Sequence, residues 1–484
     1  MNGSSGRCAA TIRRRHDYAP RMHRPSYPMN EGLTNTPAPP RPNRNLAQLF
    51  RSRLAHIFAG TLLAGLVSRL LVLVMTIIMA RQLSPDGYGV FTFATGTAML
   101  IAQLAGMGWP ALMSRLIPVF RIQQNWSALR ALIRWGDAVV LMGSVAAFLI
   151  VLAAIFTPGF DQSLQAGLVL TLILIFPASL MVSRRAQLAG ARRPAIGIIF
   201  AEALPAAAVI LVALIGGLAS ALPAVATFGL AATVSAVLST YVFRLAVPRE
   251  TWQARPQGEP RAWMARALPL LLGNSSQQVM HRMDVVMLGP LSSLLEVGYF
   301  GAAFRLTYLM TFPQVVLMQV MTPLLSESIA ARDEPAMWRH FRMAVIFSLV
   351  TVTPVSLLLG VCSEPIVTLI FGHDFLPSAA PLKVLAISQA FAALTIPCAG
   401  LLIAAGRGAI FGLINLVAVL ANIGLNFVLI PPLGIMGAAL ASMGAVTLMF
   451  VWQASTIWHN KKSIMAGATL YAAAAVAKNT SATP

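Results

Sequence analysis

The sequence predicts an all-α polytopic membrane protein with about twelve transmembrane helices in two pseudo-symmetric six-helix lobes around a central cavity. Composition is the first observation behind this class, because 57% of the 484 residues are hydrophobic and only 10% are charged. A soluble chain has about a quarter of its residues charged and cannot hide this much apolar surface in one core. The second observation is that apolar runs of about 20 residues, the length that crosses a hydrocarbon core, recur along the chain.

Each apolar run is expected to be a helix, because a backbone without access to water must satisfy its own hydrogen bonds. The strands of an outer-membrane barrel would be shorter and would alternate between apolar and polar residues, and that pattern is absent. The expected spans are 54–80, 88–109, 135–156, 164–183, 195–215, 223–243, 266–288, 297–323, 342–361, 379–404, 409–430 and 434–456.

The distribution of the net charge of +20 favours a membrane protein over a nucleic-acid-binding one. With the N-terminus in the cytoplasm, the inner loops carry most of the Lys and Arg residues, whereas the outer loops carry only Arg81. This is the positive-inside rule. The inner-loop residues include Arg115, Arg121, Arg130, Arg134, Arg184, Arg185, Arg192 and Arg193. We therefore expect a bacterial inner-membrane protein with both termini in the cytoplasm and no nucleic-acid partner.

The organisation along the chain follows from these spans. The N-terminal stretch is rich in Pro, Arg and Asn and lacks the apolar region of a signal peptide. Met22 and Met29 leave open whether residues 1–28 belong to the native protein. The expected domains are a disordered basic cytoplasmic tail at 1–48, an N-terminal six-helix lobe at 49–245, a cytoplasmic inter-lobe linker at 246–265, a C-terminal six-helix lobe at 266–458 and a cytoplasmic tail at 459–484.

A faint internal repeat predicts the two lobes. The segment Leu83–Phe91 reads LSPDGYGVF, and Leu291–Phe300, about 209 residues later, reads LSSLLEVGYF. A second pair, LAGAR at Leu188–Arg192 and AAGR at Ala404–Arg407, recurs at the expected inner turns. An even number of helices per repeat gives both lobes the same orientation. The pseudo-twofold axis that relates the two lobes is then expected to lie along the membrane normal, with a cavity between the lobes.

The expected seventh span has a polar face that covers about half of its circumference at 100° per residue. Lipid cannot cover this face, because a charge at the bilayer centre costs several kcal/mol. The face therefore borders protein or a water-filled cavity; the two interpretations are a buried polar network that fixes helix packing and a functional wet site. Its polar residues are Asn274, Ser275, Gln277, Gln278, His281, Arg282 and Asp284.

Other charges within spans indicate the same region. Arg69 lies near the middle of the first span and Arg305 lies inside the eighth, so both belong to the first hairpin of their lobes. Together with Arg282, and with His281 as a further candidate, they predict a cationic site for an anionic substrate. Guanidinium suits phosphate because its planar donors match the oxygens and remain charged. The acids Asp284 and Glu202 are either charge partners or sites for a coupling cation.

Motifs for catalysis and cofactors are absent from the sequence. There is no G-x-x-x-x-G-K-[ST], HExxH or GxSxG pattern, and the three cysteines have no spacing that suggests a metal site or redox pair. We therefore expect no enzymatic activity, no cofactor and no metal.

An ordered set of motifs resembles the polysaccharide repeat-unit flippases, the O-antigen and exopolysaccharide translocases of the multidrug/oligosaccharidyl-lipid/polysaccharide exporter superfamily. The resemblance covers about residues 50 to 456. The matching segments are Ile78–Phe91, Arg282–Gly289 with Glu296–Phe300, Pro365–Gly372 with Asp374–Phe375, Asn422–Asn426 through Pro431, and Gly434–Ala439. Arg69 in Ser68-Arg69-Leu70 is similar to the first-helix arginine of the related lipid II flippases, which have fourteen helices.

The resemblance implies two lobes that rock about a central cationic cavity. The implied substrate is an oligosaccharide on polyprenyl pyrophosphate, flipped to the outer leaflet, with Asn274, Gln277 and Gln278 meeting sugar hydroxyls. A proton or sodium gradient would drive it, and membrane lipids, a polysaccharide polymerase and a chain-length regulator are the expected partners. The alternatives are a multidrug/cation antiporter of the same superfamily and a non-transporting membrane scaffold for polysaccharide assembly.

Overall fold

A computed structural model describes residues 44–218, 220–274, 276–308 and 310–461. Its side chains are described from residue 59 onward, except at 219, 272–278, 281, 309, 315 and 319. The chain separates into two compact units, Met1–Arg53 and Leu54–Pro484, so the expected lobes lie in the second unit except for residues 49–53. The domain boundaries predicted from the sequence stay a prediction, and the tail at 1–48 falls almost wholly outside the described residues.

The described part of the chain is helical and contains no strand. Helices of the N-terminal half come first in order. They are α1 (Arg44–Gln82), α2 (Pro85–Ala105), α3 (Trp109–Ile122), α4 (Trp126–Ile155), α5 (Gln162–Gly190), α6 (Pro194–Ile198), the π-turn η1 (Ile199–Ala203), α7 (Leu204–Leu214), α8 (Ala221–Ala246) and α9 (Arg249–Gln253).

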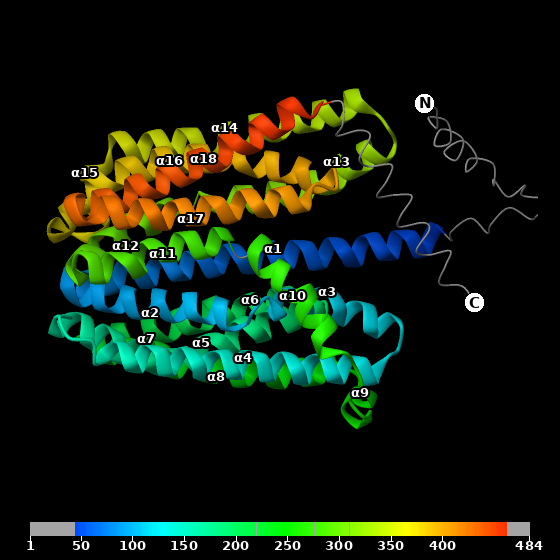
Figure 1. Cartoon of the computed structure of the whole chain (residues 1–484), viewed down its shortest axis with the longest axis horizontal. Coiled ribbons are helices and arrows are strands. Elements are labelled where there is room, and N and C mark those ends of the chain that lie inside the picture. The colour runs from blue at the N-terminus through cyan, green and yellow to red at the C-terminus, as the bar shows by residue number, and fades with distance from the viewer. Residues whose placement is uncertain (1–43, 219, 275, 309, 462–484) are drawn as a thin grey trace, which may run out of the picture. The chain divides into compact units, whose positions relative to one another are not determined.

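The C-terminal half follows the same plan. Its elements are α10 (Pro260–Asn274), α11 (Ser276–Leu291), α12 (Leu294–Tyr308), α13 (Thr311–Ala330), α14 (Glu334–Val361), α15 (Ser363–Phe371), the 3-10 turn η2 (His373–Ser378), α16 (Ala379–Ala404), α17 (Gly408–Leu433) and α18 (Ile435–His459). Figure 1 shows α13 to α18 gathered in one group and α2 to α8 in another.

The expected spans agree with these helices. Within the described ranges, ten helices are long and apolar enough to cross a membrane. The pair α12 and α13, bent by 47°, makes an eleventh. The expected span 266–288 falls on α10 and α11, on either side of residue 275, which is not described. The chain is therefore a multi-pass membrane protein with a two-lobed helical fold.

Two interruptions follow from proline. The expected span 195–215 is broken into α6, η1 and α7, and Pro205 lies directly after the π-turn. Proline has no N–H to donate to the carbonyl four residues earlier, and its ring clashes with that carbonyl. A widened π-turn relieves this clash. Pro313 lies in the first turn of α13, just beyond the 47° bend. Both breaks lie in segments that contain or follow a predicted site residue.

The internal repeat is visible in the turns that connect the helices. Gln124 and Arg332 both adopt a left-handed conformation, with φ of 52° and 56°. The next residue in each case, Asn125 or Asp333, caps the following helix by accepting a hydrogen bond from a backbone N–H three residues on. Likewise, Arg192 after α5 and Gly406 after α16 have φ of 63° and 74°. Two lobes built on one chain plan are therefore confirmed.

The lobes meet along α2 and α12, the helices that contain the first repeat. A Cβ atom on Gly89 would overlap the carbonyl oxygen of Leu294, and a Cβ atom on Gly298 would overlap that of Pro85. Only glycine allows backbones to approach this closely. We call this contact the inter-lobe seam.

Neighbouring groups close the same end of the bundle. The Phe375 ring lies between Tyr88 and Tyr299, with ring centroids 5.8 and 6.1 Å apart. Arg81 at the end of α1 donates to the carbonyl oxygens of Ile370 at 2.8 Å and Leu369 at 2.5 Å. A cation there also complements the negative end of the α15 dipole. The single arginine predicted in an outer loop therefore links the two lobes.

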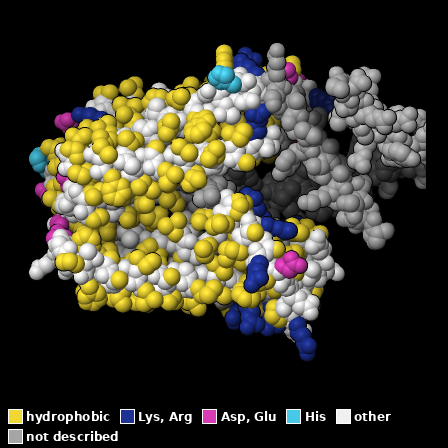
Figure 2. All heavy atoms as spheres, viewed as in Figure 1, with side chains coloured by type: hydrophobic (Ala, Val, Ile, Leu, Met, Phe, Trp, Pro, Cys, Tyr) yellow, Lys and Arg dark blue, Asp and Glu magenta, His cyan; other side chains and the backbone are white. Residues whose placement is uncertain are grey.

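Some arginines expected in inner loops lie within helices. Arg184 belongs to α5, is buried, and pairs with Asp137 of α4 through two 3.0 Å hydrogen bonds. The helix extends past the predicted end at residue 183 because this carboxylate neutralises the buried charge. Elsewhere, Lys and Arg side chains gather at one end of the molecule, as Figure 2 shows. That asymmetry agrees with the charge pattern of the sequence.

Candidate functional site

Arg69 of α1 lies against two aromatic rings of the C-terminal lobe. Its guanidinium carbon is 5.7 Å from the centroid of the Tyr308 ring and 5.4 Å from that of Phe312. These distances are typical of cation–π interactions. Tyr308 ends α12 and Phe312 lies in the first turn of α13, so the guanidinium touches both sides of the bend.

Arg282 and Arg305 lie close to the same tyrosine. Arg282 of α11 is within electrostatic interaction range of Tyr308, Arg305 and Glu202. Arg305 lies on α12, about one helical turn before Tyr308. It is also within electrostatic interaction range of Tyr88 near the inter-lobe seam. Arg69 therefore contacts Tyr308, Arg282 lies within electrostatic range of it, and Arg305 lies about one helical turn away on the same helix. We call Arg69, Arg282, Arg305, Tyr308 and Phe312 the central arginine cluster.

The three arginines also share a depth in the bundle. At 1.5 Å per helical residue, Arg282 is about 14 Å from the end of α11 and Arg305 about 16 Å from the start of α12. Arg69 is about 20 Å from the end of α1 on the same scale. These helix ends all lie at the seam end of the bundle. In a hydrocarbon core about 30 Å thick, the cluster is therefore near the middle.

The cluster has no carboxylate in direct contact. Among the described side chains, none of the ion pairs involves Arg69, Arg282 or Arg305. Glu202, in the π-turn η1, acts electrostatically on Arg282, but its carboxylate pairs with Arg185 at 2.5 Å. Partly buried cations of one sign at bilayer depth repel each other unless an anion or water joins them.

Asp284 lies on the other side of α11 and faces the interior of the C-terminal lobe. It is fully buried and accepts hydrogen bonds from Asn422 at 2.9 Å, from Asn426 at 2.8 Å and from the Ser442 hydroxyl. The Oδ1 atom of Asn426 is buried without a hydrogen-bond partner. Arg282 and Asp284 are two residues apart, about 200° around a helix at 100° per residue, which agrees with this arrangement. We call these four residues the Asp284 site.

The remaining predicted residues are not placed. The side chains of Asn274, Gln277, Gln278 and His281 lie outside the described residues, so the polar face of the seventh span stays a prediction. A central cavity lined by the cluster also stays a prediction.

Several residues of both sites were missed by the sequence analysis. Tyr308 and Phe312 are ordinary apolar-span residues in the sequence, and only the bend brings them to Arg69. Asn422 and Asn426 were noted only as part of a family motif. Their spacing of four residues in an otherwise apolar helix places both amides on one face. That spacing was a usable signal for a partner of Asp284.

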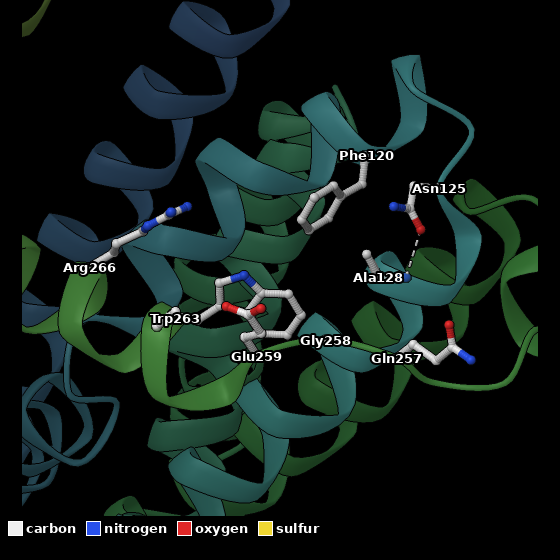
Figure 3. A pocket seen from close by; sticks show the side chains of 9 residues that line it. Phe120, Asn125, Ala128, Gln257, Gly258, Glu259, Trp263 and Arg266 are labelled. Carbon is white, nitrogen blue, oxygen red and sulfur yellow. Dashed lines mark hydrogen bonds between the residues drawn. The ribbon is translucent and has the colours of Figure 1, made fainter. Parts of the chain in front are cut away.

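A separate pocket of about 460 Å³ lies beside the inter-lobe linker. Figure 3 shows Phe120, Trp263 and Asn125 around it, with the Asn125 side chain bonded to the backbone of Ala128. Its wall contains both Glu259 and Arg266. With charges of both signs, this pocket has no clear preference for an anion or a cation.

Solved structures with the same fold are transporters. The chain is similar to an inward-facing multidrug resistance MATE family transporter of the MOP superfamily (TM-score 0.66, 15% identity, 82% of this chain and 96% of that one). It is also similar to the lipid II flippase MurJ in an inward closed conformation (TM-score 0.65, 15% identity, 84% and 89%). A MOP superfamily transporter from Pyrococcus furiosus, reported with a binding pocket of reverse polarity, matches at TM-score 0.57 (15% identity, 84% and 96%). At these identities the likeness shows the fold alone.

Matches to protein-family models identify the family of the chain. No curated protein sequence matches it. The MatE model matches residues 269–428. The model described as polysaccharide biosynthesis protein matches residues 57–329, which is more than half of the chain and includes the whole central arginine cluster. The chain therefore belongs to the polysaccharide biosynthesis protein family.

Proposed function

We propose that the protein is a flippase that moves polyprenyl-pyrophosphate-linked oligosaccharide repeat units across the bacterial inner membrane, by ion-coupled alternating access, for O-antigen or exopolysaccharide synthesis. The central arginine cluster carries this proposal. Three arginines, from α1, α11 and α12, lie within contact or electrostatic range of one another or of Tyr308 near mid-membrane depth. Because no described carboxylate pairs with them, a pyrophosphate would supply the missing negative charge.

The cluster joins the two lobes, as a transport site must. Arg69 belongs to the N-terminal half, whereas Arg282 and Arg305 belong to the C-terminal half. A substrate held by both halves can favour one relative position of the lobes only if it binds the two states with different affinity. In our proposal the arginines engage pyrophosphate better when the site faces the cytoplasm, and the prenyl chain stays in lipid. Asn274, Gln277, Gln278 and His281 are proposed to meet the sugar.

Asp284 is the better candidate for the coupling ion. Its carboxylate, the unpartnered Oδ1 of Asn426 and the Ser442 hydroxyl are oxygen ligands suited to a hard monovalent cation such as sodium. A proton on the carboxylate is the other possibility, because a buried carboxylate held only by neutral groups favours protonation. Glu202 was the second candidate, but its ion pair with Arg185 already occupies it.

The orientation and partners follow the same proposal. We place both termini and the Arg-rich end in the cytoplasm, by the positive-inside rule. A polysaccharide polymerase and a chain-length regulator would take the flipped unit on the other side. The protein itself performs no covalent chemistry in this scheme.

The second candidate is a multidrug/cation antiporter, favoured by the MatE match over residues 269–428. Cationic substrates need an acidic site, whereas the charges of the central cluster are arginines. A non-transporting scaffold, the third candidate, gives no reason for unpaired cations at bilayer depth, which are costly.

The test replaces Arg282 by Ala in cells that depend on this protein for surface polysaccharide. We expect the polymer to be lost while the protein level stays normal. Arg342→Ala, which removes an exposed arginine from α14, is the matched control and should leave the polymer unchanged. Normal polymer in the Arg282 variant would refute the role of the cluster.

Reconstitution separates the three candidates. Proteoliposomes are loaded with a fluorescent polyprenyl-pyrophosphate oligosaccharide or with a cationic dye. Movement of the labelled lipid supports the flippase, export of the dye supports the antiporter, and neither activity supports the scaffold.

A further inference from the structure

A second group of arginines lies at the Arg-rich end of the N-terminal lobe, away from the central cluster. A pocket of about 200 Å³ is lined by Pro118, Arg121 and Ile122 of α3, by Gly190 at the end of α5, and by Arg192 in the following turn. We call it the basic pocket. Its walls come from two segments about seventy residues apart that the fold brings together.

The pocket concentrates positive charge. Arg121 donates a 3.1 Å hydrogen bond to the carbonyl oxygen of Ala191, which fixes its guanidinium beside the turn. Burial, and then the charges of Arg192 and Arg193, lower the pKa of Arg121. The ion pairs formed by the described side chains include none of these three arginines. An anion between them would therefore relieve repulsion and complete their hydrogen bonding.

The backbone at Arg192 strengthens this interpretation. Arg192 has φ of 63°, a left-handed conformation that glycine adopts without strain. The corresponding turn of the other lobe has Gly406 there, with φ of 74°. The N-terminal lobe therefore has an arginine in a strained backbone conformation where the C-terminal lobe has glycine. Compared with glycine, Arg192 places a guanidinium group on the pocket wall.

The surroundings indicate that the anion also has a hydrocarbon part. Helix α3 has 14 residues and is about 21 Å long, too short to cross a bilayer. Val119 and Ile122, at its end beside Arg121, expose 41% and 71% of their surface. Apolar side chains next to guanidinium groups, at the end of a membrane-spanning bundle, match the boundary between headgroups and acyl chains.

We propose that the basic pocket binds an anionic phospholipid, with its phosphate between Arg121 and Arg192 and its acyl chain along Val119 and Ile122. The proposal does not depend on which substrate the protein transports. It assigns to this lobe a fixed lipid that holds α3 against the turn between α5 and α6.

The test uses purified full-length protein and native mass spectrometry with phosphatidylglycerol or phosphatidylcholine. The variant is Arg192→Gly, which removes the charge and leaves the residue that the other lobe uses. The control is Arg332→Gly, which removes an exposed arginine with φ of 56° from the turn after α13, so charge and backbone change equally. We expect Arg192→Gly to weaken phosphatidylglycerol binding at least about fivefold and the control to leave it unchanged.

Three results would overturn the proposal. They are equal loss in both variants, unchanged binding in Arg192→Gly, and equal binding of the two lipids by the unaltered protein. Inorganic phosphate that competes at the affinity of the lipid would show a free anion as the occupant and would also overturn it. Arg192→Asn, another residue that tolerates this conformation, repeats the measurement if the glycine variant is unstable.

Discussion

Gly89 of α2 and Gly298 of α12 are equivalent residues of the internal repeat, and each lies against the backbone of the helix that contains the other. Gly89 faces the carbonyl of Leu294, and Gly298 faces the carbonyl of Pro85, which is the repeat equivalent of Leu294. Such reciprocal contacts define a local twofold axis between the lobes, as in a symmetric dimer. The residues of the internal repeat therefore form the contact between the lobes at the inter-lobe seam, in addition to giving each lobe the same fold.

Replacing Gly89 by Ala should lower the thermal unfolding midpoint in detergent, because the new methyl group overlaps a backbone carbonyl. Overpacking of this kind costs about 1–3 kcal/mol. The control is Gly87→Ala, two residues earlier in the same helix, where a Cβ atom would meet the nearest side chain at 3.5 Å. Alanine is otherwise the better helix former. An equal drop for both variants would contradict close packing at the seam.

Replacing Tyr308 by Leu should weaken the binding of a short prenyl pyrophosphate about two- to thirtyfold, because the ring no longer positions Arg69. The range corresponds to about 0.5–2 kcal/mol for a cation–π contact. Tyr308→Phe keeps the ring and should bind almost as well as the unaltered protein. Calorimetric titration measures both, and equal affinity of the Leu and Phe variants would exclude a role for the ring face.

Replacing Asp284 by Asn should uncouple lipid flipping from the ion gradient while leaving the fold intact. Asparagine has the same shape, and its oxygen can still accept from Asn422 and Asn426 while its NH2 group donates to the Ser442 oxygen, but it lacks the charge that a cation or proton requires. Flipping in proteoliposomes is measured with and without sodium or proton gradients. Gradient-driven flipping that persists in the variant would assign Asp284 to packing alone.

The ion pair between Asp137 and Arg184 should stabilise the N-terminal lobe. Asp137→Asn leaves a buried guanidinium without its counterion; since the Asp137 side chain is 34% exposed, we expect a loss of about 1–3 kcal/mol. A double-mutant cycle with Arg184→Gln measures the coupling from unfolding midpoints. Additive effects of the two single replacements would show that the pair contributes nothing.

The sequence predicted the spans and the three arginines because both have signals that depend on local composition. Apolar length marks a helix that crosses a membrane, and a charge inside such a run is conspicuous. The ion pair of Arg184 could not be predicted, because its partner Asp137 is 47 residues away. The contacts of Tyr308 and Phe312 with Arg69 were also missed. They depend on the bend between α12 and α13, which hydrophobic periodicity does not encode. The pairing of Glu202 with Arg185 likewise depends on the π-turn.

The contact of Arg69 with both Tyr308 and Phe312 constrains how α12 and α13 can move relative to each other. The two rings lie on opposite sides of the 47° bend between α12 and α13, so one guanidinium fastens the two helices at their joint. An anion bound to the guanidinium while it rests on both rings would hold α12 and α13 together at the bend. Occupancy of the site would then set the stiffness of the bend, and release of the substrate would make the helix pair more flexible.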